Sequence, residues 1–418
     1  MQRANSRWDA VIVGAGAAGL LAAIRAAERG RRTLLLEKNT KPGVKILMSG
    51  GTRCNLTHAT DRAGIVEAFG PQGKFLYSAL AALSPQQVVE IFEAEGVRTK
   101  VEDTGKIFPE SDRALDVQEA LLRRLRRTDC TLALGEPLEE MQLAAEGFEL
   151  RTPLRQLFAE KLLVTTGGQS YPGCGTTGDG YRWAADLGHT IVPPRPALVP
   201  ITVDVPWVRE LQGVTIPDVE LRVIEPASAG GKDRLLTRRR GSFLFTHFGL
   251  SGPVALDVSR EISGHAEPRK LALVCDFLPT MSEPALVEWF AQQAATAGRK
   301  QLASVLPEDL PRRLTTALLA VLSLPPERKA AELSKVDRGR LVKAIKQMLI
   351  PVSGTRGFKK AEVTAGGISL DEVDSRTMAS KRVPNLYLAG EVLDLDGPIG
   401  GYNFQAAFST GWLAGGSL

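Results

Sequence analysis

Residues 9–37 have the sequence DAVIVGAGAAGLLAAIRAAERGRRTLLLE, and this stretch indicates the fold class. The apolar run over 10–13 is typical of a buried strand, and the alanine- and leucine-rich segment that ends near Gly30 predicts a helix. A second apolar run over 33–36 predicts another strand. The order strand, helix, strand predicts a βαβ unit, so we expect an α/β protein.

The turn between the first strand and the helix carries three glycines in the spacing of a dinucleotide-binding loop. Gly14 permits the tight turn, Gly16 lets the backbone approach a pyrophosphate, and Gly19 lets the helix pack closely on the strand. The N-terminus of the helix offers unpaired N–H groups and partial positive charge to phosphates. Glu37 would accept hydrogen bonds from ribose hydroxyls and repel a 2′-phosphate. We expect FAD or NAD here rather than NADP; the alternative is a glycine-rich turn without a ligand.

Further segments supply groups suited to the rest of a dinucleotide. Residues 45–55 (KILMSGGTRCN) combine backbone donors, a hydroxyl, a guanidinium and an amide, although an ordinary loop is the alternative. Residues 163–168 (LVTTGG) end an apolar strand in small residues, and 386–391 (LYLAGE) end another in an acid. Residues 400–403 (GGYN) open the last helix, whose N-terminus can stabilise negative charge on a reduced flavin. Cys54 is expected to be a small packing residue rather than a reactive thiol.

The composition excludes several classes of protein. The chain has 418 residues, 44% hydrophobic and 24% charged, which is typical of a globular protein of two or three domains. Four cysteines without a C-x-x-C pair and four scattered histidines exclude a disulfide scaffold, and we expect no protein-bound metal. A net charge of +5 mildly favours anionic ligands. The arginine clusters at 123–127 and 238–240 are expected to be solvated faces rather than a nucleic-acid patch.

An apolar stretch from Ala10 to Ala27 follows two arginines and superficially resembles a secretory signal. Three glycines interrupt the stretch, and Arg25 and Glu28 would lie on a polar helix face, which argues against a signal. No other stretch of the sequence has the length needed to span a bilayer. We therefore expect a cytoplasmic enzyme without a membrane partner.

The sequence pattern changes along the chain and predicts a discontinuous first domain. Helices and strands alternate up to the Pro193-Pro194 pair, β-type runs separated by Gly and Pro turns follow, and a helical pattern comes next. After Gly367 the pattern returns to strands and turns. We expect a Rossmann-like FAD-binding domain at 1–194 and 362–418, a β-rich, barrel-like insert at 195–280 and 351–361, and a helical subdomain at 281–350.

Together these motifs resemble the FAD-binding glutathione-reductase-type superfamily and, more narrowly, the bacterial BaiN-like flavoprotein family. The resemblance spans nearly the whole chain. It rests on K-x-L-x-SGG-x-RCN-x-T (45–57), KIFP (106–109), TT-GG-x-SYP (165–172), TGDGY (177–181), FTHFGLSGP (245–253) and AGE-x-L-D-x-DG-x-x-GGYN (389–403). One departure is Thr52, where the family loop commonly has a third glycine; a β-branched residue restricts the backbone there.

The resemblance implies the same domain arrangement and FAD as the cofactor. We expect the FAD to be held non-covalently, because the phosphate-binding features suit a dinucleotide held in this way and the sequence shows no covalent attachment site. Members of the family have been assigned as bile-acid dehydro-reductases or aminoacetone oxidases, and most have no settled substrate. From the motifs and the resemblance we expect the following residues to bind FAD: Gly14, Gly16, Ala18, Gly19, Glu37, Lys38, Lys45, Ser49, Gly50, Arg53, Cys54, Asn55, Thr166, Gly167, Gly390, Glu391, Gly401, Tyr402 and Asn403.

We expect an FAD-dependent oxidoreductase that passes a hydride between a small organic substrate and the flavin. No second strand-GxGxxG-helix unit follows the first, so NAD(P)H would dock only transiently, or oxygen would take its place. The catalytic residue is unassigned; Tyr171, Tyr402, His247 and Arg53 are candidates by motif position.

Two alternatives stay open at the level of sequence. One is an RNA-modifying flavoprotein, suggested by the mild basic charge, although we expect no nucleic-acid partner. The other is an NAD-dependent dehydrogenase without flavin. The segment 246–253 is either a cover for the flavin or a strand-ending turn with core phenylalanines. The sequence does not indicate an oligomeric state.

Overall fold

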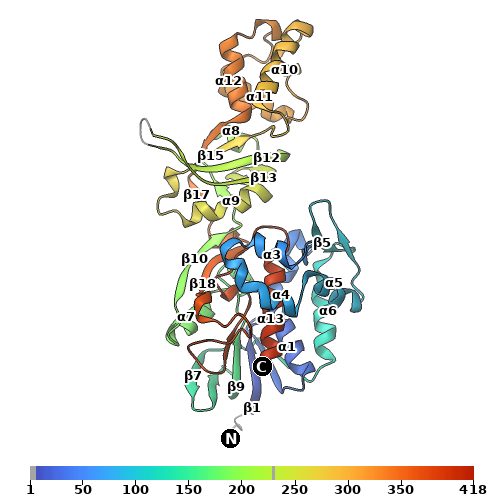
Figure 1. Cartoon of the computed structure of the whole chain (residues 1–418), viewed down its shortest axis with the longest axis vertical. Helices are drawn as coiled ribbons and strands as arrows, with labels where there is room; N and C mark the ends of the chain where they lie inside the picture. Colours follow the sequence, from blue (N-terminus) through green and yellow to red (C-terminus); the bar gives the residue numbers. More distant parts are fainter. Residues whose placement is uncertain (1–5, 228–230) are drawn as a thin grey trace. The chain divides into compact units, whose positions relative to one another are not determined.

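The computed structural model describes residues 6–227 and 231–418 of the chain. The chain divides into two compact units (Figure 1). Unit 1 comprises Met1–Pro196 and Glu362–Leu418, and unit 2 comprises Ala197–Ala361. Unit 2 is therefore inserted into the sequence of unit 1. The three-part division that the sequence suggests, with separate β-rich and helical parts in the insert, stays a prediction.

Unit 1 is built on a mixed sheet whose central strands are parallel and buried. Its strand order is β6-β2-β1-β9-β8-β7, with β19 also paired to β9. The bounds are β1 Ser6–Val13, β2 Thr33–Glu37, β6 Thr131–Leu134, β7 Glu140–Ala144, β8 Gly147–Arg151, β9 Gln156–Val164 and β19 Leu386–Leu388. Val13 lies opposite Leu36 on one side and Val164 on the other, and Leu388 lies opposite Val164. The ends of β1, β2, β9 and β19 therefore meet at one edge of the sheet, where α/β proteins bind their ligands.

Helices α1 (Ala17–Glu28) and α13 (Tyr402–Ser417) pack together although they are far apart in the sequence (Figure 1). Two glycines of α13 make this contact close. A Cβ on Gly411 would lie 2.3 Å from the carbonyl oxygen of Ala18, and a Cβ on Gly415 would lie 2.3 Å from that of Ala22. The two backbones therefore touch, and the contact fixes α13 against the helix that follows the first glycine loop.

Smaller elements complete unit 1. An antiparallel sheet has the order β3-β5-β4, and β10 pairs with β18 where the chain leaves and re-enters the unit. Ser84 and Gln87 form a reciprocal cap at the start of α5, and Pro85 occupies the first position of the helix. The bounds are β3 Thr57–His58, β4 Thr99–Val101, β5 Lys106–Pro109, β10 Ile191–Ala197, β18 Val363–Ile368, α2 Val44–Met48, α3 Arg62–Ala68, α4 Tyr77–Ala82, α5 Pro85–Ala94, α6 Ala114–Arg126 and α7 Asp179–Asp186.

Unit 2 contains an antiparallel sheet with the order β16-β15-β12-β13-β14-β11-β17. The strands are β11 Ile201–Thr202, β12 Thr215–Glu225, β13 Arg234–Thr246, β14 Gly249–Ser251, β15 Ala272–Asp276, β16 Met348–Pro351 and β17 Gly354–Thr355. Helix α9 (Pro253–Gly264) packs against β13 and β12. Phe243, Phe245 and Phe277 are fully buried and their rings contact one another.

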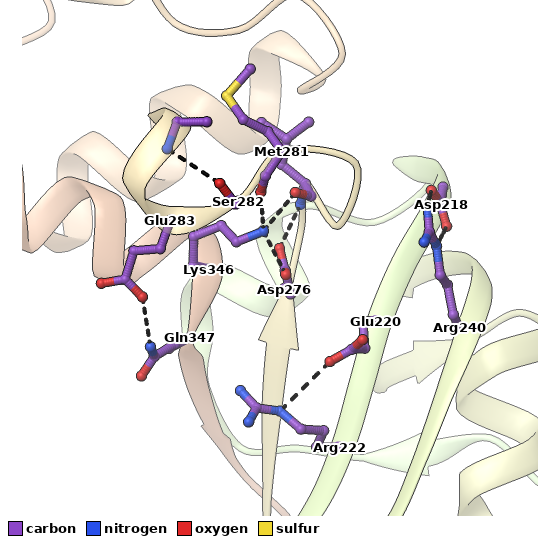
Figure 2. Close-up of polar contacts among 12 residues, drawn as sticks. Asp218, Glu220, Arg222, Arg240, Asp276, Met281, Ser282, Glu283, Lys346 and Gln347 are labelled. Atoms are coloured by element: carbon purple, nitrogen blue, oxygen red, sulfur yellow. Dashed lines mark hydrogen bonds and ion pairs between the residues drawn. The ribbon is translucent and has the colours of Figure 1, made fainter. Parts of the chain in front are cut away.

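The helical part of unit 2 consists of α8 Pro206–Glu210, α10 Glu283–Thr296, α11 Arg312–Val321 and α12 Lys335–Lys346. A buried lysine joins it to the sheet. The Nζ atom of Lys346 lies 2.6 Å from a carboxylate oxygen of Asp276 and donates to the carbonyl oxygens of Leu278 and Met281, at 2.7 and 2.6 Å (Figure 2). These acceptors compensate the burial of the ammonium group. Among the described residues, no helix combines the length and apolar character needed to cross a membrane.

Candidate functional site

The first glycine loop joins β1 to α1, and its three glycines serve different purposes. Gly14 has φ +104°, and a Cβ there would lie 2.7 Å from the carbonyl oxygen of Thr165. A Cβ on Gly19 would lie 1.8 Å from the carbonyl oxygen of Gly14. A Cβ on Gly16 would meet no atom within 4 Å, and its φ of −80° suits any residue. Packing of the protein itself therefore requires Gly14 and Gly19, whereas Gly16 faces open space at the N-terminus of α1.

Glu37, at the end of β2, is held against this loop. The side chain is buried, and its two carboxylate oxygens accept from the backbone N–H groups of Ala15 at 2.9 Å and Asn39 at 2.8 Å. A carboxylate oxygen can accept more than one hydrogen bond, so capacity remains for ligand hydroxyls. The geometry fits the ribose-binding role expected of this acid.

Lys38 ties the segment before α7 to the end of β2. Its Nζ donates to Thr177 Oγ1 and to a carboxylate oxygen of Asp179, both at 2.6 Å. Partial burial acts to raise the pKa of Asp179, but hydrogen bonds from Lys38 and Thr177 outweigh it and hold that pKa below its ordinary value. The lysine is thus paired with a carboxylate inside the protein.

The second glycine loop follows α2 and runs through left-handed backbone conformations. Gly50, Gly51, Thr52 and Cys54 have φ values of 55°, 67°, 71° and 61°. A β-branched residue such as Thr52 rarely adopts this conformation, so the loop is strained there. Residues 50–52 are exposed, whereas Cys54 is fully buried and burial raises the pKa of its thiol to about 12. Cys54 is therefore a packing residue with a protonated thiol, as expected.

Arg53 is engaged within the protein. Its guanidinium lies over the ring of Phe108, with 3.9 Å between the guanidinium carbon and the ring centroid. Its Nη1 lies 2.6 Å from a carboxylate oxygen of Glu102 and 3.3 Å from one of Asp112. These contacts neutralise its charge and hold the second glycine loop against β5.

The AGE segment after β19 connects the two loops. Glu391 pairs with Lys45 at 2.6 Å through one oxygen and accepts from the Thr364 backbone N–H at 2.8 Å through the other. Gly390 has φ +78°, and a Cβ on it would lie 2.8 Å from the Cβ of Ala18. Residues from α1, α2 and the end of β19 therefore line the same region.

Two buried polar atoms in this region have no hydrogen-bond partner. They are Oδ1 of Asn55, a residue that is 8% exposed, and Oγ1 of Thr166. A Cβ on Gly401, at the N-terminus of α13, would lie 2.8 Å from that Asn55 oxygen. Leaving a buried polar group unpaired costs about 1–3 kcal/mol, so these atoms suit a polar ligand that completes their hydrogen bonds.

Tyr402 begins α13, and its ring stacks on the imidazole of His58, with 4.7 Å between centroids and 21° between planes. The Nδ1 atom of His58 lies 3.0 Å from the carbonyl oxygen of Gly400. The side chain of Asn403 exchanges hydrogen bonds at 2.9 Å with the backbone of Gly397, so it shapes its own loop. His58 was not among the residues expected from sequence, and its place directly after the RCN motif is the signal that could have found it.

The structure brings most of the expected residues to the edge of the sheet where β1, β2, β9 and β19 end. Those that face this edge or contact its lining are Gly14, Gly16, Ala18, Gly19, Glu37, Lys38, Lys45, Thr166, Gly167, Gly390 and Glu391. Asn55, Gly401 and Tyr402 lie together at the start of α13. The side chains of Arg53 and Asn403 bond elsewhere within the protein, and Ser49 donates to the carbonyl oxygen of Ile46 at 2.8 Å. His247 lies in unit 2. In the described part of the chain, no group of His, Cys, Asp and Glu could hold a metal ion.

Comparisons with known proteins bear on this site. The family model described as HI0933-like protein Rossmann domain matches residues 8–417. The chain is 35% identical over 410 residues to a ribosomal RNA dihydrouridine synthase of Escherichia coli (strain K12), covering 97% of this chain and 96% of the relative. It is 32% identical over 407 residues to a 3-dehydro-bile acid delta(4,6)-reductase of Clostridium scindens, covering 97% of each.

A solved structure shows the same fold. It is the 3-ketosteroid delta1-dehydrogenase from Sterolibacterium denitrificans in complex with 1,4-androstadiene-3,17-dione, with a TM-score of 0.51, 15% sequence identity and 99% of each chain covered. At this identity the likeness concerns the fold alone.

Proposed function

The chain belongs to the HI0933-like Rossmann-domain family and is an FAD-dependent oxidoreductase, and we propose that it reduces a carbon–carbon double bond conjugated to a carbonyl group. Membership confirms the resemblance to BaiN-like flavoproteins and the Rossmann-type α/β fold class that the sequence predicts. The reaction, the substrate and the residues below are proposals.

The names of two relatives support the reaction, since both describe one kind of chemistry. Dihydrouridine differs from uridine by saturation of the ring double bond beside a carbonyl. A delta(4,6)-reductase of a 3-dehydro bile acid acts on double bonds conjugated to the 3-oxo group. In each case a hydride adds to an electron-poor carbon conjugated with the carbonyl, the β carbon or, in a dienone, the δ carbon, and a proton adds to a carbon that carries the resulting enolate charge. A reductase for such bonds is the simplest activity that both relatives share.

The residues at the sheet edge fit FAD. The open space at Gly16 and the N-terminus of α1 suit the pyrophosphate, and Glu37 suits the ribose. Asn55 and Thr166 carry unpaired polar atoms whose hydrogen bonds a flavin or its ribityl chain would complete. When bound, a reduced flavin supplies the hydride.

The chain's own part is to orient the substrate and to move the proton. The N-terminus of α13 carries the positive end of the helix dipole, which stabilises negative charge beside it. Tyr402 and His58 stack at the start of α13, and we assign them as the groups that transfer the proton to the substrate. Whether NAD(P)H or oxygen serves as a transient partner, and whether the flavin is held non-covalently, stay predictions.

Uridine in ribosomal RNA is the substrate that we favour. The relative that is 35% identical to this chain is named a ribosomal RNA dihydrouridine synthase, and the match covers almost its whole length. The charge distribution agrees, because unit 2 has 24 Lys and Arg against 17 Asp and Glu, whereas unit 1 has 28 against 30. A basic insert suits a polyanionic substrate. A small conjugated ketone is the second candidate, supported by the reductase name, and it matches the small organic substrate expected from sequence.

Complementation tests the favoured substrate. The chain is expressed in an Escherichia coli strain that lacks the similar ribosomal RNA dihydrouridine synthase, and dihydrouridine in purified ribosomal RNA is measured by nucleoside mass spectrometry. We expect dihydrouridine to return, and a Gly16→Val variant to leave the RNA unmodified. Purified protein is then reduced anaerobically and offered either the RNA or a 3-oxo-delta(4,6) steroid, with flavin reoxidation as the readout. Reoxidation by the steroid alone would replace RNA with the small ketone, and reoxidation by neither would contradict the proposed reaction.

A further inference from the structure

Two clusters of basic residues in unit 2 differ in whether acids neutralise them. The first group is Arg238–Arg240 on β13, which the sequence singles out. Arg238 pairs with Glu220. Arg240 donates to both carboxylate oxygens of Asp218 at 2.8 and 2.6 Å, and Figure 2 draws this pair. Arg239 donates to the carbonyl oxygen of Arg238 at 2.9 Å. The first group is therefore largely neutralised on the sheet surface.

The second group lies where β14, β11 and β17 pair side by side. Thr202 of β11 is opposite Gly249 of β14 on one side and Gly354 of β17 on the other. In this register the turn between β13 and β14, residues 247–248, lies level with the residue before β17, and Arg356, which follows β17, reaches the turn through its long side chain. The sheet thus joins two sequence segments about a hundred residues apart.

Aromatic and basic side chains meet at this place. The guanidinium carbon of Arg356 lies 4.4 Å from the ring centroid of Phe248, and the rings of His247 and Phe248 contact edge to face at 4.9 Å. Lys359 and Lys360 come three and four residues after Arg356 in the sequence and are exposed, as is His247. We call these five residues the aromatic–basic tip. Across residues 6–227 and 231–418, no acidic side chain forms an ion pair with its arginine or its two lysines.

This combination has a specific chemical meaning. A guanidinium stacked on an aromatic ring keeps its N–H groups directed outward, where they can form bidentate hydrogen bonds to phosphate. Unstacked bases bind on aromatic rings and arginine planes, and single-stranded nucleic acids are bound by such rings beside positive charge. A duplex keeps its bases stacked inside and offers mainly phosphates.

We propose that the aromatic–basic tip docks a single-stranded segment of RNA, with Arg356, Lys359 and Lys360 on phosphates and the rings of His247 and Phe248 on bases. The inference rests on the proposed function for its partner and adds the surface that holds the partner. It also gives the FTHFGLSGP motif a role outside the core: Phe243 and Phe245 are fully buried, whereas the turn after them is not.

Binding is measured by fluorescence anisotropy with the full-length, FAD-loaded protein. The probe is a fluorescein-labelled RNA of about 12 nucleotides without secondary structure, and the comparison probe is an RNA duplex of the same length. Salt is varied from about 50 to about 200 mM. We expect the single strand to bind more tightly than the duplex, and tighter duplex binding would overturn the proposal.

Variants locate the contact. Each neutralised phosphate contributes about 0.7 to the slope of log affinity against log salt for single strands, so the combined change Arg356→Ala, Lys359→Ala and Lys360→Ala should lower the slope by about 2. Phe248→Leu should weaken binding by about 5- to 100-fold with the slope unchanged. Arg239→Ala is the matched control, since it removes an exposed arginine that lies outside the aromatic–basic tip, and it should change affinity less than about 2-fold. Equal losses of RNA affinity in the single variants Arg239→Ala and Arg356→Ala would overturn the assignment of the aromatic–basic tip as the RNA-binding surface.

Two readouts keep this inference separate from the proposed function. The flavin spectrum of every variant shows that it remains folded and loaded. If the wild-type protein forms dihydrouridine and the tip variants bind RNA normally, the proposed RNA docking at the tip is overturned and the proposed function is not affected. If the wild-type protein forms no dihydrouridine and the tip variants lose oligonucleotide binding, the proposed function is overturned and the proposed RNA docking at the tip is supported.

Discussion

The two glycine-rich loops of unit 1 use glycine for different physical reasons. In residues 14–19, two glycines are required because a Cβ would strike the protein's own backbone, and the third leaves open space for a ligand. In residues 50–54, the backbone itself is left-handed at four positions, two of which are not glycine. In the first loop, close packing requires glycine at two positions and the third is left open. In the second loop, the left-handed backbone favours glycine. A glycine-rich composition alone therefore does not say what a substitution will do.

The largest effect is expected at Gly19. A Cβ added by Gly19→Ala would lie 1.8 Å from the Gly14 carbonyl oxygen, and neither atom belongs to a flexible side chain. Helix α1 would have to move away from β1, at a cost of about 3 kcal/mol or more in the free energy of unfolding. Denaturant unfolding measures this cost. Gly339→Ala is the control, because a Cβ in that helical position meets nothing within 4 Å and should be neutral or stabilising. Equal stability of the two variants would contradict the close packing.

Gly16→Val should separate ligand binding from folding. The added side chain meets open space in the protein, so we expect the free energy of unfolding of the apo-protein to change by less than about 1 kcal/mol. The same side chain fills the place that suits the pyrophosphate, and loss of two or more charge-assisted hydrogen bonds would weaken FAD binding by about 100-fold or more. Titration of apo-protein with FAD gives the affinity. An unchanged affinity would show that the pyrophosphate lies elsewhere.

Glu37→Ala tests the acid at the end of β2 that is held against the same loop. The change removes the acceptor for the N–H groups of Ala15 and Asn39 and the acceptor proposed for the ribose. Hydrogen bonds to charged groups contribute about 1.5–3 kcal/mol, so FAD affinity should fall by about 10- to 100-fold. The effect should be smaller than that of Gly16→Val in the same titration. A larger effect would mean that Glu37 holds the loop's shape rather than one part of the ligand.

Local signals made the first loop predictable from sequence. The strand, the three glycines and Glu37 lie within thirty residues of one another, and each follows from a rule of backbone conformation or burial. Helices α5 and α6 carry local signals of the same kind, a Ser-Pro start in the first and apolar spacing along one face in the second. The N-terminal half of β13 was not predicted, because its exposed arginines hide the strand pattern. Strands β3 and β4 are too short to produce one.

Long-range pairing made parts of the site unpredictable. Lys45 and Glu391 were both expected at the cofactor, but their ion pair joins residues 346 positions apart and no sequence rule indicates it. Arg53 was expected at the cofactor because of its motif, whereas the structure pairs it with Glu102 and Asp112. The stacking of His58 on Tyr402 depends on the placement of α13, which the contacts of Gly411 and Gly415 determine. Such contacts appear only once the helices are packed.

The smallest effect is expected at Thr52, the residue that departs from the family's glycine. A left-handed conformation costs a non-glycine residue about 1–3 kcal/mol, and Thr52 has φ +71°. Thr52→Gly removes this strain but adds about 0.4–1 kcal/mol of unfolded-state entropy, so the protein should become more stable by about 1 kcal/mol. Thr40→Gly is the matched control, because Thr40 is also exposed and is absent from the positive-φ residues; it should destabilise. Chemical denaturation of both apo-proteins gives the sign of the change in the free energy of unfolding for each substitution. If the two substitutions destabilise equally, Thr52 is not strained, and the second loop owes its shape to its neighbours rather than to its own backbone.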